Sequence, residues 1–397
     1  MRIAIISDHQ GWAWAGCEEL WWALASRALQ DGHKVAVFLC RRNVPEGRIN
    51  PLLKLGMELH LPPAAGTALV ARTRRLSWKF GSMISALADP FRAIGKFSPD
   101  VVFYNAGDPI PNSVVLDYLR QSGALRWPYV IMTQNSHFCD PPPTAPYRDA
   151  AVKFFQGARV VLSAAQRTLS DIEHILAARL PTTRIIRNPV NLKDTSAIPL
   201  PADSVVGIAS LGRLSILSKG QDLLIGALAS EKLREKAWRL SFYGDGADSD
   251  HLLHLAKHYG ISDRVAIKGY AADIRAVWAE NHVLALPSRF ESAPLVVVEA
   301  MLCGRLCIVN DVGGVTDWIR EPETGFVSAA LNVPSFQNAL ERAWAARSEW
   351  ESICMRAHGE AKRLIDPDPG RTILKLLTEV AGQTDTMNLG ARAQVEG

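Results

Sequence analysis

The sequence lacks the paired cysteines that build a structural metal site or a disulfide framework. Its six cysteines stand at positions 17, 40, 139, 303, 307 and 354, and no two of them form a C-x-x-C pair. Cys303 and Cys307 are four residues apart, but no neighbouring group of His or Cys completes a set of metal ligands. The spacing therefore predicts no structural zinc, and we expect free thiols in a reducing compartment.

The sequence also lacks long hydrophobic runs and a strong charge of either sign. No apolar run approaches the ~20 residues that span a bilayer, and the first residues reach Asp8 too soon for the apolar region of a signal peptide. A net charge of +4 over 397 residues argues against a nucleic-acid partner, because such partners need concentrated basic patches. These features predict a cytoplasmic protein.

What the sequence does contain is the composition of a globular protein, with 48% hydrophobic and 21% charged residues. Its length allows two domains, each with its own core. Short apolar runs alternate with helical patterns, as parallel α/β sheets require. The expected strands of the first half are residues 2–7, 34–40, 101–104, 129–133, 159–163 and 184–187. The pattern restarts after a proline-containing stretch, with expected strands at 205–211, 240–243, 265–270, 283–287 and 306–309.

Residues 287–314 carry two carboxylates, Glu291 and Glu299, around an expected helix start. Ser292 is a candidate N-cap, and Pro294 suits the first helical turn. The amides at the start of such a helix form an anion site, which the two carboxylates would flank. That arrangement suits an anion bearing hydroxyl groups, as in a sugar nucleotide. The apolar run 295–298 leaves a buried strand as the alternative.

Two cations follow the first strand of the second half. Arg213 and Lys219 are six residues apart across a strand-to-helix loop, so both can reach one anion there. The alternative is a pair of solvated surface cations. Residues 244–246, Gly-Asp-Gly, predict a tight turn before another helix, which alone is weak evidence for phosphate binding.

Candidate ligand-binding residues also follow the first-half strands. Gly16 allows a close approach of backbone to a ligand, and Glu18 lies in the first turn of a helix, where it either serves function or complements the helix dipole. His137 either binds a substrate oxygen or takes a proton, or is simply solvated. The tryptophans at positions 12, 14, 21 and 22 either stack on a sugar or belong to the core.

Residues 72–87 interleave basic and large apolar side chains. A basic amphipathic helix of this kind can lie on an anionic membrane surface. An ordinary surface helix with its apolar face on the core is the favoured alternative.

In their order along the chain, these motifs resemble those of the retaining family 4 glycosyltransferases of the GT-B fold. The motifs are Gly212-Arg213 with Lys219-Gly220, Tyr243-Gly244-Asp245-Gly246, Lys268-Gly269-Tyr270, and Pro287-Ser288 with Glu291, Glu299-Ala300-Met301 and Gly304. The resemblance covers nearly the whole chain and is densest over residues 205–327. The first half departs at Asn135, where the family often has histidine, and residues 281–282 are Asn-His instead of Ala-Asp.

The resemblance implies two Rossmann-like α/β domains facing across a cleft. Residues 1–190 would bind the acceptor, 191–204 would link the domains, and 205–365 would bind a nucleotide-diphosphate sugar. Residues 366–382 would form a helix returning to the first domain, and 383–397 a frayed tail. The acceptor would be a glycan or a glycolipid. Peripheral membrane contact through residues 72–87 stays the less favoured interpretation of their basic amphipathic pattern.

The resemblance also implies residue roles. Glu291 would lie by the donor sugar and Glu299 by the ribose hydroxyls, while Arg213 and Lys219 would clamp the diphosphate without a metal or other cofactor. His137 is the further catalytic candidate. The remaining donor-side candidates are Gly212, Gly244, Gly246, Lys268, Gly269, Tyr270, Ser292, Ala293, Pro294, Leu295 and Val296. The acceptor-side candidates are Trp14, Gly16, Glu18 and Asn135. A nucleotide-sugar epimerase of similar fold and a non-catalytic sugar-nucleotide-binding partner protein are the alternative functions.

Overall fold

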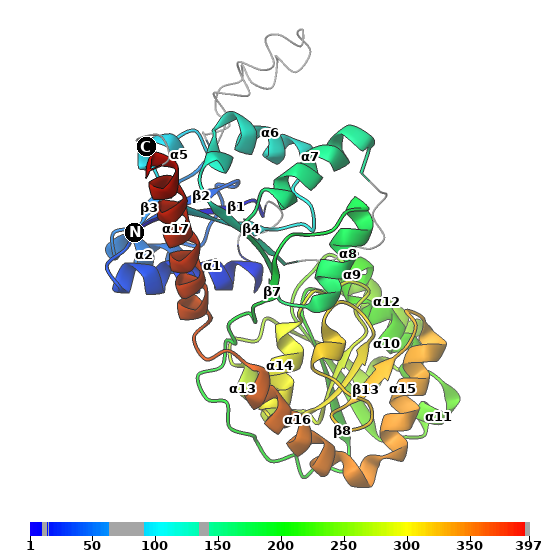
Figure 1. The fold of residues 1–397 in the computed structure, drawn as a ribbon. Coiled ribbons are helices and arrows are strands. Elements are labelled where there is room, and N and C mark those ends of the chain that lie inside the picture. The colour runs from blue at the N-terminus through cyan, green and yellow to red at the C-terminus, as the bar shows by residue number, and fades with distance from the viewer. Residues whose placement is uncertain (10–13, 15, 63–90, 135–142, 394–397) are drawn as a thin grey trace. The chain divides into compact units, whose positions relative to one another are not determined.

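The computed structural model describes the chain except for residues 10–13, 15, 63–90, 135–142 and 394–397 (Figure 1). The expected basic helix at 72–87, and the candidates Asn135 and His137, lie outside the described residues. The chain divides into two compact units, one comprising Met1–Pro189 with Asp366–Gly397 and the other Val190–Ile365.

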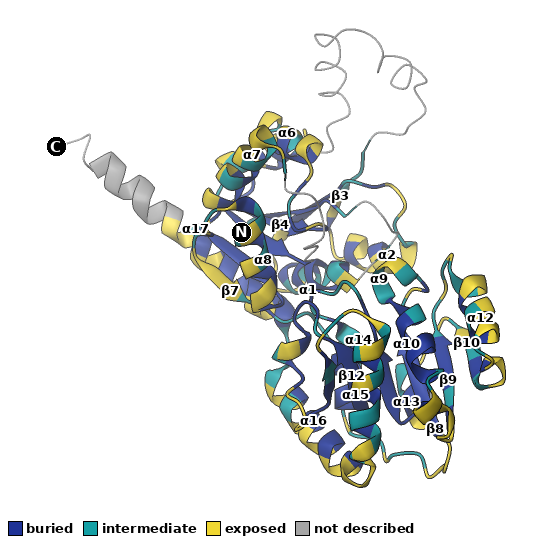
Figure 2. Cartoon of the chain, turned by 90° about the vertical axis from the view of Figure 1, so that its right-hand side faces the viewer, coloured by how far each residue is buried: buried dark blue, intermediate teal, exposed yellow. Residues whose placement is uncertain are grey.

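The first unit is built on a parallel sheet of seven strands in the order β3-β2-β1-β4-β5-β6-β7. Each central strand is a continuous apolar run because helices cover both of its faces (Figure 2). The strands are β1 (Arg2–Ser7), β2 (Lys34–Leu39), β3 (Glu58–His60), β4 (Val101–Ala106), β5 (Tyr129–Thr133), β6 (Val160–Ser163) and β7 (Thr183–Ile185).

Helices pack on both faces of this first sheet. Its helices include α1 (Gly16–Gln30), α2 (Glu46–Lys54), α5 (Ile94–Phe97), α6 (Ser113–Gln121), α7 (Ala145–Gln156), α8 (Gln166–Leu176) and the final helix α17 (Pro369–Ala393). Helix α17 runs alongside α1 and also contacts β4 (Figure 1). It continues past Gln383, where the sequence predicts a frayed tail, so that expectation is wrong for the backbone up to Ala393.

The second unit has a parallel sheet of six strands in the order β10-β9-β8-β11-β12-β13. The strands are β8 (Val206–Leu211), β9 (Trp238–Tyr243), β10 (Val265–Gly269), β11 (Val283–Leu286), β12 (Leu306–Asn310) and β13 (Phe326–Ser328). The helices are α9 (Ile216–Lys219), α10 (Gln221–Leu228), α11 (Glu231–Arg234), α12 (Ser249–His258), α13 (Ile274–Glu280), α14 (Leu295–Leu302), α15 (Val333–Ala345) and α16 (Trp350–Leu364). Both units are thus Rossmann-like α/β domains, as predicted.

Two apolar clusters hold the second sheet between its helices. One cluster joins strand residues such as Ile208 and Phe242 to α10, α12 and α15. The other joins Ala209 and Leu284 to α13, α14 and α16.

Within the described residues, no helix has the length and hydropathy needed to cross a bilayer.

The segment predicted as a linker is attached to the second unit. The buried Arg305 guanidinium donates to the carbonyl oxygens of Ile198 and Pro199, at 2.9 Å each. His282 bridges the Pro201 carbonyl oxygen (3.1 Å) and the β8 amide of Gly207 (3.0 Å). Residues 198–201 therefore pack along the second unit and do not form a free linker.

Candidate functional site

The strand order of the second sheet reverses between β8 and β11, which are neighbours although distant in the chain. Ligands of open parallel sheets bind at the carboxyl ends of strands beside such a reversal. Gly212 and Arg213 follow β8 directly, and the loop 287–294 follows β11. Arg213, a cation candidate from the sequence, and Glu291, a carboxylate candidate, therefore lie on the two loops that border this position.

Lys219 and Glu291 form an ion pair between these loops. The Lys219 Nζ lies 2.6 Å from Glu291 Oε1, and the Ser288 hydroxyl donates to the same oxygen at 2.7 Å. The Glu291 side chain is 9% exposed and that of Lys219 25% exposed. The carboxylate is therefore held by two donors in a mostly buried position, while the ammonium keeps solvent access for a further anionic partner.

Arg213 lies at the same end of β8, and much of the residue's surface is open to solvent. The Lys219 side chain extends across the neighbouring Gly212, with Cε 3.5 Å from the position that a Cβ of residue 212 would take. The Gln221 amide donates to the Arg213 carbonyl oxygen at 2.8 Å and fixes the loop backbone. Partial burial lowers the pKa of the Arg213 guanidinium, which stays cationic at neutral pH.

The glycines after β9 allow two loops to touch. A Cβ at Gly244 would overlap the carbonyl oxygen of Gly212, and one at Gly246 would overlap that of Leu214. The Gly244 amide also donates to the Gly269 carbonyl oxygen at 2.8 Å, which joins the ends of β9 and β10. These glycines therefore shape the rim of the site through backbone packing.

The helix after β11 starts later than the sequence predicts. Helix α14 begins at Leu295 with Pro294 as its N-cap, so Ser292 is not the cap, and Glu291 precedes the helix. The reason is tertiary, because the Ser292 carbonyl oxygen accepts the Gly314 amide, and the loop packs on the turn at Gly313. Ala293 and Pro294 lead into the helix, whose first residues are Leu295 and Val296, and the strand alternative for 295–298 is excluded.

Glu299 lies within α14 and is 7% exposed. Burial raises its pKa to about 7, although a hydrogen bond from the Asn191 backbone opposes that shift. The protonation state of its carboxyl therefore depends on any ligand that replaces water or offers hydroxyl donors.

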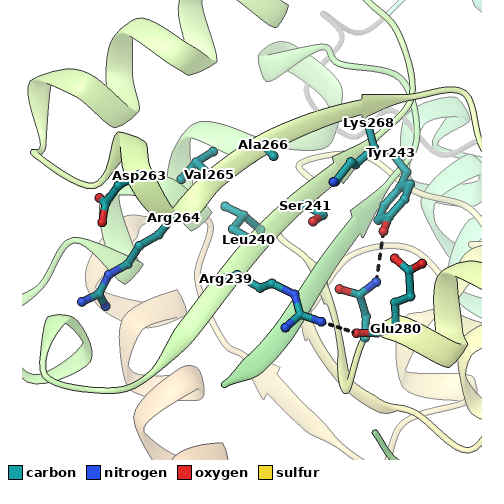
Figure 3. A pocket seen from close by; sticks show the side chains of 11 residues that line it. Arg239, Leu240, Ser241, Tyr243, Asp263, Arg264, Val265, Ala266, Lys268 and Glu280 are labelled. Atoms are coloured by element: carbon teal, nitrogen blue, oxygen red, sulfur yellow. Dashed lines mark hydrogen bonds between the residues drawn. The ribbon is translucent and has the colours of Figure 1, made fainter. Parts of the chain in front are cut away.

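A polar pocket of about 210 Å³ lies along β9 and β10 (Figure 3). Tyr243 and Lys268 line it together with Glu280 at the end of α13, and the Asn281 amide donates to the Tyr243 hydroxyl at 3.1 Å. The sequence predicts Lys268 as a ligand residue but misses the pocket, because its walls come from strands and a helix end that are distant in the chain. Tyr270, beyond β10, is 82% exposed.

In the first unit, Glu18 is completely buried and paired with Arg41, and the Ser7 hydroxyl donates to its other oxygen at 2.8 Å. These contacts support a structural role in anchoring the start of α1, whose first residue is Gly16. Trp14 donates to the buried Glu19 carboxylate at 2.8 Å and lies under the Arg48 guanidinium. Trp21 is completely buried and belongs to the core.

Sequence reasoning passed over a second buried carboxyl at the end of β1. Asp8 accepts hydrogen bonds from the Tyr104 hydroxyl and the Gly107 amide, which ties together the loops after β1 and β4. Burial raises its pKa to about 7. Only the pairing of β1 with β4, distant in sequence, brings these partners together.

Across the described parts of both units, no three His, Cys, Asp or Glu side chains gather as metal ligands.

Comparison with known proteins addresses the second unit most directly. Residues 206–346 match the family described as "Glycosyl transferases group 1". The chain is 31% identical to alpha-D-kanosaminyltransferase of Streptomyces kanamyceticus over 134 residues, which are 33% of this chain and 34% of that protein. It is 36% identical to glycogen synthase of Deinococcus radiodurans over 156 residues, 38% and 33% of the two chains. The chain thus spans about a third of the length of these relatives.

Residues 206–346 are thus similar to glycosyltransferases of the GT4 type, and the fold of the chain is similar to that of GT-B glycosyltransferases. The solved structures extend the likeness in fold to nearly the whole chain. Anabaena HepE in complex with UDP has a TM-score of 0.72 and 19% identity, covering 96% of this chain and 100% of that one. It was also solved with UDP-glucose. WaaG, a glycosyltransferase involved in lipopolysaccharide biosynthesis, has a TM-score of 0.66 and 15% identity, covering 95% and 100%.

Proposed function

We propose that this GT-B protein transfers a sugar from a nucleoside-diphosphate donor to a hydroxyl acceptor, with retention at the anomeric carbon and without a metal ion. The observation that carries the proposal is the Lys219–Glu291 pair, which stands beside Arg213 at the carboxyl ends of β8 and β11. All three residues fall inside the stretch that matches the glycosyltransferase family.

The two cations suit the leaving group. As the bond between the anomeric carbon and the diphosphate oxygen breaks, negative charge grows on the diphosphate. Preplaced cations stabilise that charge more in the transition state than in the bound donor. Arg213 supplies a planar fork and Lys219 a compact ammonium, and together they take the role that Mg²⁺ plays in other phosphate sites.

Glu291 suits the other end of the breaking bond. Its carboxylate, held by Lys219 and Ser288, would stabilise positive charge at the anomeric carbon. The acceptor oxygen attacks from the same face as the departing diphosphate, forms the new glycosidic bond, and passes its proton to a diphosphate oxygen. Retention follows from this front-face geometry, and covalent attack by Glu291 is the less favoured route. Glu299 would receive the ribose hydroxyls.

The donor class is supported by similar proteins. HepE, the structural neighbour described above, binds UDP and UDP-glucose. We extend that donor class to this chain, and we propose a glycan or lipid-linked hydroxyl as the acceptor.

The test begins with a thermal-shift panel of UDP-glucose, UDP-galactose, UDP-N-acetylglucosamine and GDP-mannose, since a bound ligand raises apparent stability by mass action. Release of nucleoside diphosphate from the best donor is then measured with and without a polyol or glycan acceptor, in buffer and in EDTA. Acceptor-dependent release that survives EDTA supports the proposal. Sugar interconversion without release would instead indicate an epimerase, and binding without turnover a non-catalytic partner protein.

A further inference from the structure

Arg289 is a side chain that the proposed mechanism does not use, yet it connects the two loops that carry the mechanism. Its guanidinium forms two parallel bonds with Asp222 at the start of α10, from Nη1 to Oδ1 at 2.7 Å and from Nη2 to Oδ2 at 2.8 Å. A bidentate pair of this kind fixes direction as well as distance. Both side chains are about one quarter exposed, so the pair is partly shielded from solvent.

The same arginine also holds α9, the short helix that ends in Lys219. Arg289 Nη1 donates to the Ile216 carbonyl oxygen at 2.6 Å. The backbone amides of Arg289 and Phe290 both donate to the Ser218 carbonyl oxygen, at 2.9 and 3.2 Å. Ser218 directly precedes Lys219, and Phe290 directly precedes Glu291. The contacts therefore set the register of one catalytic candidate against the other.

We propose that the Arg289–Asp222 pair is a positioning device that aligns Lys219 with Glu291. This proposal concerns the site of the proposed function and rests on it only for the rate predictions below. The four-residue helix α9 is too short to hold its own direction, because a single turn has few internal hydrogen bonds. Arg289 supplies the missing constraint from the opposite loop, while Asp222 fixes the guanidinium from the far side.

The physical consequence is a dependence of rate on alignment. A misplacement of about 1 Å caused outside the reacting groups can cost as much as a hundredfold in rate. Donor affinity should change less, because the nucleoside makes its own contacts. We expect Arg289→Gln and Asp222→Asn each to lower kcat about tenfold or more, with a change in donor KM of less than about threefold.

The first test needs no activity. Competitive labelling with acetic anhydride reports the accessibility and protonation of Lys219. The exposed Lys232, whose ammonium pairs with Glu341 at 3.0 Å, serves as the internal reference. We expect Arg289→Gln and Asp222→Asn to raise Lys219 labelling relative to Lys232, and the exchanged pair Asp222→Arg/Arg289→Asp to lower it again. Wild-type labelling of Lys219 in both single variants would overturn the positioning role.

The second test couples the pair to Lys219 by a double-mutant cycle, using UDP-glucose or the panel donor with the highest turnover. If Arg289 acts through Lys219, Arg289→Gln should have little further effect on kcat in a Lys219→Ala background. An equal loss in both backgrounds would contradict the proposal. Arg342→Gln, which breaks a distant pair with Glu321 (2.6 Å), is the matched control and should leave kcat unchanged. Altered labelling of Lys219 with normal turnover would support the alignment of Lys219 by Arg289, but it would contradict the claim that this alignment sets the rate.

Discussion

Replacement of Lys219 by alanine separates the catalytic from the structural part of the site. A donor aimed at charge that develops in the transition state contributes about 3–4 kcal/mol, so Lys219→Ala should lower turnover at least a hundredfold. The substitution also removes the ion-pair partner of Glu291, whose side chain is 9% exposed and keeps the Ser288 hydroxyl at 2.7 Å. A buried group that loses a partner costs about 1–3 kcal/mol, so the variant should also unfold at lower denaturant concentration.

A second substitution distinguishes the two effects. In Lys219→Ala/Glu291→Gln the uncompensated charge is gone, so stability should recover while turnover stays low. Turnover is measured as nucleoside-diphosphate release at saturating donor, and stability as the midpoint of urea unfolding. Lys232→Ala is the matched control, because that lysine is 76% exposed and should affect neither quantity. A folded Lys219→Ala variant with turnover within about threefold of wild type would refute the diphosphate clamp.

Three further predictions concern other parts of the chain. Gly313→Ala should lower stability by at least about 2 kcal/mol in urea unfolding, because the new Cβ would overlap the Glu291 carbonyl oxygen, and wild-type stability would contradict the close approach. Burial raises the pKa of Glu299 from 4.5 to about 7, so its neutral form favours the fold, and its contribution declines as pH rises between those values. Glu299→Gln should therefore gain stability relative to wild type between pH 5 and pH 8, by up to about 3 kcal/mol, and a pH-independent difference would exclude this origin. If residues 72–87 contact membranes, the protein should sediment with anionic vesicles at low salt and be released at high salt, whereas no binding at low salt would remove the idea.

The amino-acid sequence by itself determined the fold class and most strands. Buried parallel strands must be continuous apolar runs, so residues 3–6 and Val283–Leu286 can be recognised as strands from the local sequence alone. The candidate cations and carboxylates were also visible, because each follows a predicted strand and such positions converge at one edge of a parallel sheet.

The tertiary structure decided what depends on contacts between segments distant in the chain. The helix after β11 begins at Leu295, not after Ser292, because the preceding loop bonds to the turn at Gly314. The Arg289–Asp222 pair and the raised pKa of Asp8 likewise arise from loops that only the strand order brings together. Local periodicity encodes which face of an element is buried, but hydrogen bonding and desolvation depend on neighbours that only the folded chain supplies.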